Sequence, residues 1–277
     1  MRIFIALITS FFCFTACGSS GGASSQSYSG YSNERSIYVD THKGCSASAA
    51  SRSSGQRFTI IPFPGNAAFK RHFFKNTDKM ADLFLGDSFT YPDIQFFDDE
   101  GRPNAWAVSA KSQYARPKVL IGPNMIEFLV DPILTGGTGF NTAALSSVLA
   151  HEYAHLVQFE LDARGSTKEL ELMADTLSGY HSAFGAIVAD RYDLSSDQLR
   201  GLSYQLSNSQ KRVFELGDYK IYDRNHHGTP RERLRAFNAG VEFAIGQARR
   251  SGRIYRDHDD FLDAVEFAAD FHDVYIP

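Results

Sequence analysis

The stretch His151-Glu-Tyr-Ala-His155 lies near the middle of the chain and has the form H-E-x-x-H. Two histidines four residues apart on a helix project from the same face, about one turn apart. Two neutral imidazoles at that separation can hold one zinc ion, and Glu152 between them can reach a water molecule on that ion. The motif therefore predicts a helix built around a metal site.

The residues around the motif predict that this helix is long and buried, over residues 142–161. Asn141 is a suitable N-cap, and apolar residues recur on nearly every side of the helix. A helix that is apolar all round lies in a protein core. Buried histidine and glutamate side chains need polar partners, and a metal ion would satisfy them.

A second helix is predicted after a short polar turn. Ser166 and Glu169 form a capping box, which marks a helix start. Glu171 and Asp175 are four residues apart and share one face of this helix. Catalytic zinc is commonly held by two histidines and a glutamate, so Glu171 is the predicted third ligand. Asp175 is expected to accept a hydrogen bond from the far ring nitrogen of a liganding histidine, His151 by preference.

Glu169 is the competing candidate for the third ligand. It lies two residues before Glu171, but no acidic residue follows four positions later on its own face. Glu171 is therefore the preferred ligand, and one zinc ion per chain is the expected cofactor.

The paired motifs H-E-x-x-H and Glu171-x-x-Ala-Asp175 resemble those of the gluzincin zinc metallopeptidases. Within that group the chain is most similar to the neutral zinc metallopeptidases and to the CAAX prenyl protease-like peptidases with their soluble periplasmic relatives. Residues 104–108 and then 118–122 resemble the Asn-Ala-Phe-Ala strand and the edge strand that precede the zinc helix in the latter. His155-Leu-Val-Gln158 resembles the H-x-x-Q continuation of the former, in which a Cys usually stands at the position of Thr176.

The resemblance implies a zinc metallopeptidase whose substrate is a protein or peptide. Glu152 would then take a proton from the water that attacks the peptide carbonyl and pass it to the leaving amine. Residues 227–233 resemble the C-terminal His…Arg segment of the family, which implies that His227 and Arg233 face the metal site and assist catalysis there. The alternative interpretation of this segment is that His227 lies on the surface and that Arg231 and Arg233 take part in an ion-pair network on a helix face.

The rest of the chain predicts an α+β fold that is mainly helical, with a small mixed sheet packed on the zinc-binding helix. Strands are expected at residues 35–40, 57–62, 92–98, 104–109 and 118–122, and further helices at 66–85, 123–130, 195–217, 229–251 and 259–272. Residues 99–103 predict a hairpin turn with solvated acidic side chains. An extended peptide could add to the edge of such a sheet by backbone pairing.

The first 16 residues resemble a bacterial signal peptide, because Arg2 precedes an apolar run that is too short to span a bilayer. Small residues before Cys17 resemble a lipobox, which implies cleavage before Cys17 and lipid on it. The alternative is an ordinary signal peptide with an incidental cysteine, and palmitate labelling would distinguish them. Residues 17–56 are interpreted as a flexible tether and 57–277 as the metallopeptidase domain. Cys45 is left without a partner cysteine.

The composition is that of an ordinary globular protein, with 277 residues, 43% hydrophobic residues and a net charge of −4. This charge gives no reason to expect a nucleic-acid partner. The lipid anchor implies attachment to a membrane of the bacterial cell envelope. The expected membrane is the outer one, with the protein facing the periplasm. Two other functions stay open: a non-catalytic lipoprotein that binds unfolded client proteins and carries a structural zinc, and a zinc hydrolase that acts on cell-wall amides.

Overall fold

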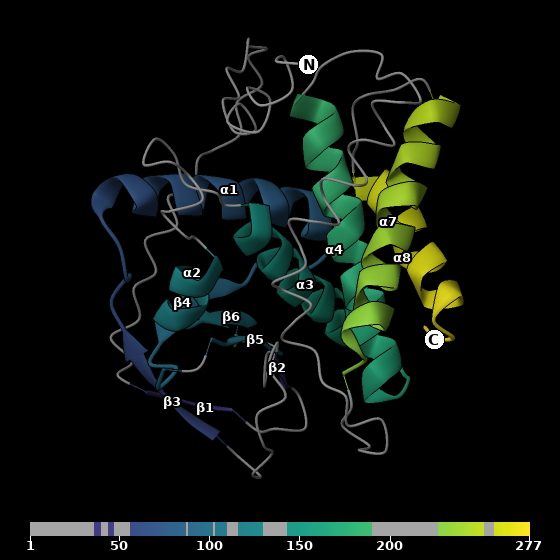
Figure 1. The fold of residues 1–277 in the computed structure, drawn as a ribbon. Coiled ribbons are helices and arrows are strands. Elements are labelled where there is room, and N and C mark those ends of the chain that lie inside the picture. Colours follow the sequence, from purple (N-terminus) through teal and green to yellow (C-terminus); the bar gives the residue numbers. More distant parts are fainter. Residues whose placement is uncertain are drawn as a thin grey trace.

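The fold is α+β and mainly helical, with a small mixed sheet packed against the motif helix, which confirms the predicted fold class (Figure 1). The structure is a computed structural model that describes residues 36–39, 44–46, 56–86, 88–101, 103–109, 116–129, 143–189, 227–251 and 258–277. The predicted signal peptide, Cys17, Asn141 and the predicted helix 195–217 lie outside these ranges.

The strands in the described ranges are β1 (Ser36–Val39), β2 (Gly44–Ser46), β3 (Gln56–Ile61), β4 (Asp93–Phe97), β5 (Ala105–Val108) and β6 (Lys118–Ile121). The helices there are α1 (Ala67–Leu85), α2 (Pro123–Leu129), α3 (Ala143–Glu160), α4 (Thr167–Ala189), α7 (Pro230–Ser251) and α8 (His258–Phe271). Except for β2, these elements match their predicted bounds closely. None of these helices combines the length and the hydrophobicity that crossing a bilayer requires.

The sheet has the strand order β1-β3-β4-β6-β5-β2. Strands β4 and β6 are parallel, and the other neighbouring pairs are antiparallel. Two expectations are therefore wrong. Residues 118–122 are central rather than at the edge, because β6 lies between β4 and β5. For the same reason β4 and β5 do not form a hairpin. In addition, β1 and β2 come from the stretch that the sequence assigns to the tether.

Asp99 is not solvated, which corrects the prediction for this turn. Its side chain is buried and accepts hydrogen bonds from the backbone of Asn124 at 3.3 Å and of Met125 at 3.2 Å, at the start of α2. Glu100 and Gly101 both have positive φ and make the turn. Asp99 therefore connects this turn to the start of α2.

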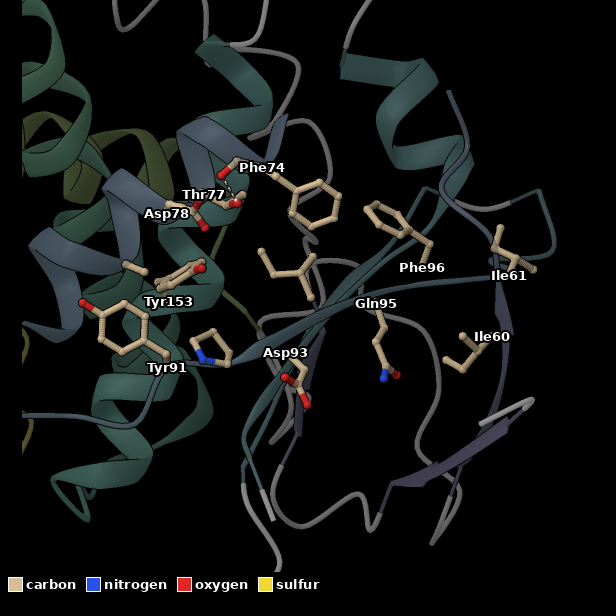
Figure 2. A pocket seen from close by; sticks show the side chains of 13 residues that line it. Ile60, Ile61, Phe74, Thr77, Asp78, Tyr91, Asp93, Gln95, Phe96 and Tyr153 are labelled. Atoms are coloured by element: carbon tan, nitrogen blue, oxygen red, sulfur yellow. Dashed lines mark hydrogen bonds between the residues drawn. The ribbon is translucent and has the colours of Figure 1, made fainter. Parts of the chain in front are cut away.

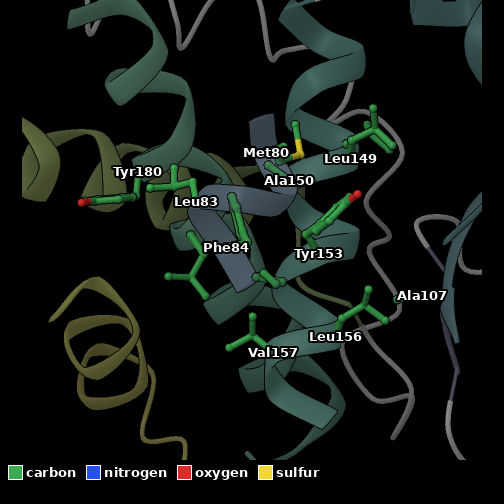
Figure 3. Packing of buried hydrophobic residues seen from close by; sticks show 14 of the residues in the cluster. Met80, Leu83, Phe84, Ala107, Leu149, Ala150, Tyr153, Leu156, Val157 and Tyr180 are labelled. Carbon is green, nitrogen blue, oxygen red and sulfur yellow. The ribbon is translucent and has the colours of Figure 1, made fainter. Parts of the chain in front are cut away.

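Helix α3 is the centre of the molecule, with the sheet on one side and α4 and then α7 on the other (Figure 1). Ala105 and Ala107 of β5 are fully buried in the same core as α3, and their small side chains allow close approach. Phe84 of α1 packs in this core with Tyr153 of α3, with ring centroids 6.0 Å apart (Figure 3). Burial of each such large apolar side chain contributes about 1.5–3 kcal/mol to folding.

A mostly apolar pocket lies between α1 and strands β3 and β4 (Figure 2). Tyr153 of α3 forms part of its wall. Because Tyr153 is two residues from both His151 and His155, it projects from the opposite side of the helix. The pocket and the two histidines are therefore separated by α3.

Helices α4 and α7 run side by side and approach each other most closely at two glycines (Figure 1). A Cβ atom on Gly179 would lie 1.9 Å from the Phe237 carbonyl oxygen, and one on Gly240 would lie 1.8 Å from the Thr176 carbonyl oxygen. Both neighbours are backbone atoms and cannot turn away. The absence of side chains at these positions lets α7 bring its residues next to α4.

We expect Gly240→Ala to destabilise the protein by about 3 kcal/mol, because the added methyl group forces the two helices apart. Gly246→Ala on the same helix is the control. The nearest atom to its Cβ would be the flexible Arg250 guanidinium at 3.4 Å, so this change should stabilise by about 0.5 kcal/mol. Urea unfolding of the metal-free protein measures both. Equal stability of the two variants would contradict this description of the helix contact.

Candidate metal centre

Three predicted ligands meet in the core where α3 faces α4. His151 and His155 of α3 place their Nε2 atoms 3.0 Å apart. The Glu171 carboxylate of α4 lies 3.3 Å from His151 Nε2 and 3.6 Å from His155 Nε2. One ligand atom from each side chain lies within 4.8 Å of the others, and all three residues are buried. The group can therefore hold a metal ion.

Glu169, the competing ligand candidate, has another role. Its carboxylate accepts a hydrogen bond from the Ser166 backbone N–H at 2.6 Å, and the Ser166 hydroxyl accepts one from the Glu169 N–H at 3.3 Å. This is the capping box that the sequence predicts. The capping box fixes the start of α4, and Glu171 lies in the first turns of this helix and faces α3.

The outer nitrogens of both imidazoles face oxygen atoms. His151 Nδ1 lies 2.9 Å from Asp175 Oδ1, and His155 Nδ1 lies 2.8 Å from Gln158 Oε1. Because a carboxylate oxygen and an amide oxygen can only accept, a hydrogen on each Nδ1 suits these neighbours, and in neutral rings both Nε2 lone pairs then face each other. Two lone pairs at 3.0 Å repel unless a positive charge lies beside them, so the donor set fits a cation.

The pKa values show that the centre favours positive charge. Burial disfavours the imidazolium of His151, but the carboxylates of Asp175 and Glu171 outweigh it and raise the pKa to about 10. Burial and the charge on His151 lower the pKa of His155 to about 4. Burial also opposes ionisation of Glu171, yet His227 and the ligand histidines hold its pKa well below the ordinary value. A divalent cation would supply the charge that one proton supplies here.

Asp175 joins the centre to helix α7. Arg233 donates from Nε to Asp175 Oδ2 at 2.7 Å and from Nη2 to Asp175 Oδ1 at 2.8 Å, and both residues are buried. Burial raises the pKa of Asp175, but Arg233 and His151 lower it overall. The resemblance implies that Arg233 assists catalysis at the metal site. In the structure its guanidinium is paired with the Asp175 carboxylate, which lies beside His151 Nδ1.

Glu152 lies next to His151 in α3 and is not one of the three residues that could hold the metal ion. It is 0% exposed, and neither carboxyl oxygen has a hydrogen-bond partner of ordinary geometry among the described residues. Burial raises the pKa of Glu152 to about 8, against the effects of the His151 charge and of the Ala107 backbone in β5. The carboxyl group is therefore close to both the histidine pair and strand β5.

His227 reaches the centre from the loop before α7. Its Nδ1 lies 3.1 Å from Glu171 Oε1, and its side chain is 12% exposed, more than any of the three ligands. Thr229 and Glu232 form the predicted capping box, with Thr229 N–H to Glu232 Oε2 at 2.9 Å and the Glu232 N–H to Thr229 Oγ1 at 3.2 Å. Gly228, between His227 and Thr229, has φ of 92° and allows the turn. The helix start thus positions His227 at the more open side of the centre.

Thr176 follows the second motif and connects three helices. Its hydroxyl lies within hydrogen-bond distance of the Leu172 and Ala236 carbonyls, at 3.0 and 3.1 Å, and of His272 Nε2 at 2.8 Å. It thereby joins α4 to α7 and to the residue after α8, and none of these contacts involves a ligand.

Comparison of the chain with protein-family models, with curated proteins and with solved structures finds no match. The likeness to gluzincins therefore rests on the two motifs and on the geometry of the His151, His155 and Glu171 group.

Proposed function

We propose that the chain is a zinc-dependent endopeptidase of the bacterial cell envelope that hydrolyses peptide bonds in proteins or peptides. His151, His155 and Glu171 would hold the ion. The donor set of two imidazoles and one carboxylate suits zinc and leaves one position of a tetrahedron for a reactant. The envelope location rests on the sequence of the N-terminus, with the lipid on Cys17 as the anchor.

The observation that carries the enzymatic proposal is the position of Glu152. A buried carboxyl group without an ordinary hydrogen bond is costly for folding. A structural zinc site needs no such group beside its ligands, whereas hydrolysis needs a base there.

The reaction follows from the roles of the chain's own residues. Zinc, when bound, supplies Lewis acidity that polarises a carbonyl and makes water more acidic. Glu152 accepts the proton of the attacking water and later donates it to the leaving amine. Asp175, held by Arg233, keeps His151 in the tautomer whose Nε2 lone pair faces the centre. His227 is the group that we assign to hydrogen-bonding of the carbonyl oxygen as charge develops on it.

A second function has one observation in its favour. All three ligands and Glu152 are 3% exposed or less, as expected for a structural zinc site. The alternative is then a non-catalytic envelope lipoprotein that binds unfolded clients. It gives Glu152 no role, so it predicts that a change at this residue alters no function of the protein.

The experiment that tests the proposed function is metal removal. The purified chain should cleave an unfolded protein such as casein, lose this activity in 1,10-phenanthroline, and regain it when zinc is added. The isomer 1,7-phenanthroline, which does not chelate, is the control. Cleavage that persists in 1,10-phenanthroline after the bound metal has been removed would exclude a metal-dependent peptidase.

A further inference from the structure

Gln158, which is 3% exposed on α3, makes hydrogen bonds at both ends of its amide. Its Nε2 donates to the Leu170 carbonyl oxygen at 2.8 Å, and its Oε1 lies 2.8 Å from His155 Nδ1. Since a carbonyl oxygen can only accept, the amide nitrogen must face Leu170 and the amide oxygen must face His155. The His155 Nδ1 atom is therefore the donor.

This chain of donors and acceptors determines the lone pair of a metal ligand. With hydrogen on Nδ1, neutral His155 carries its lone pair on Nε2, which faces His151 and Glu171. Leu170 directly precedes Glu171 in α4. One side chain thus joins a ligand on α3 to the backbone beside a ligand on α4.

We propose that Gln158 is a positioning residue of the metal centre, which sets the tautomer of His155 while the Leu170 carbonyl fixes the orientation of its amide. This proposal rests on metal binding at the centre and not on peptide hydrolysis. Gln158 serves His155 as Asp175 serves His151, but with a neutral acceptor, so it adds no further negative charge to the core.

The variants Gln158→Met and Gln158→Glu separate the two ends of the amide. The first removes both hydrogen bonds at similar volume and should weaken zinc binding by about 10- to 100-fold. The second keeps an acceptor for His155 and loses the donor to Leu170, so zinc affinity should stay within about threefold of wild type. Gln247→Met on α7 is the matched control, because Gln247 is also buried and donates to the Asp260 carbonyl at 3.3 Å, away from the centre.

Zinc affinity is measured in the full chain by competition with a chromophoric chelator, and the His155 tautomer by nitrogen NMR of the histidines. We expect wild type, Gln247→Met and Gln158→Glu to bind zinc with similar affinity. Gln158→Met should bind zinc far more weakly, and its His155 should be a mixture of both tautomers. It is overturned if Gln158→Met binds zinc no worse than Gln247→Met, or if Gln158→Glu is as weak as Gln158→Met. If Gln158→Met does not fold, the wild-type tautomer and Gln158→Glu decide. A wild-type chain that binds no zinc contradicts the proposed function instead.

A separate observation concerns the outer edge of β5. Strand β2 pairs with it antiparallel, with Cys45 opposite Ala107 and Gly44 opposite Val108. Strand β5 packs against α3, where Ala107 shares one core with Ala150 and Tyr153 on either side of Glu152, so β2 lies along the strand that passes the candidate base. A peptide that pairs with this edge would bring its carbonyl groups near Glu152 by the same backbone bonds.

We infer that Gly44–Ser46 occupies the edge of β5 that a peptide substrate would use, and that it must leave before the substrate can pair there. This inference rests on the proposed function. The full chain with Glu152→Gln, which should bind without cleaving, is compared with and without a proline in β2. Neighbouring N–H groups in a strand point to opposite edges of that strand. Of the N–H groups of Gly44 and Cys45, one therefore faces β5, and a proline at that position removes this donor.

The expected results are hydrogen exchange at least about tenfold faster for the β5 amides that face β2, and labelled casein bound at least about tenfold more tightly, in one or both proline variants. Ser24→Pro, in the Ser/Gly-rich stretch, should change neither. Unchanged exchange at β5 would overturn the inference directly. Faster exchange without tighter casein binding would also overturn it, since β2 would then cover an edge that the substrate does not use. Phenanthroline-sensitive cleavage would tell whether the proposed function still stands.

Discussion

Glu152→Gln is expected to lower the rate of peptide hydrolysis by about 10²- to 10⁴-fold, the usual contribution of a general acid–base group. The amide is similar in size, so the packing of the fully buried side chain is kept. It cannot accept a proton at neutral pH, and so the attacking water is not deprotonated. The zinc content should equal that of wild type, because Glu152 is outside the group of ligands.

The matched control for this change is Glu160→Gln, at the exposed end of the same helix. It makes the same chemical change on α3 and should leave kcat/KM unchanged. The comparison is made with zinc-loaded protein and casein peptides. Wild-type activity in Glu152→Gln would remove Glu152 from the reaction, and loss of zinc in this variant would show that Glu152 supports the metal rather than the chemistry.

Arg233→Leu is expected to lower the free energy of unfolding by about 3–5 kcal/mol, because it leaves the Asp175 carboxylate buried with one of its two partners removed. The metal-free protein should show this loss in urea unfolding. The zinc-loaded form should also bind its metal less tightly, since Asp175 holds His151.

Lys168→Leu is the control for Arg233→Leu. The pair of Lys168 and Glu232 also joins α4 to α7, but both side chains are more than a third exposed, so its loss should cost about 0–1 kcal/mol. The double variant Arg233→Leu with Asp175→Leu should recover part of the stability, as the unpaired charge is gone. Equal effects of Arg233→Leu and Lys168→Leu would mean that the buried pair does not support the centre.

Local patterns were sufficient to predict most helices and strands in the described part of the chain. Helix α4 is an example, because its capping box, its face with Glu171 and Asp175, and its length are all written in consecutive residues. The order of the strands could not be predicted in this way. It depends on pairings between strands that are distant in sequence, such as β4 with β6, and local patterns do not carry this information.

The ligands could be predicted because their spacing along α3 and α4 carries the geometry with it. The partner of Arg233 could not, since the pair joins positions 58 residues apart across the close contact of α4 and α7. Gln158 was within reach of sequence reasoning, because it lies three residues after His155 on one helical face. Strand β2 gave no signal, since three residues within a Ser-rich stretch have no readable alternation.

The most direct measurement is the metal content of the purified full chain after dialysis, in wild type, Glu171→Ala and Glu169→Ala. We predict about one zinc per chain in wild type and in Glu169→Ala, whose carboxylate only caps α4, and little or none in Glu171→Ala. A wild-type chain without a bound transition metal after exposure to zinc, or a Glu171→Ala variant that retains it fully, would contradict the metal centre described above.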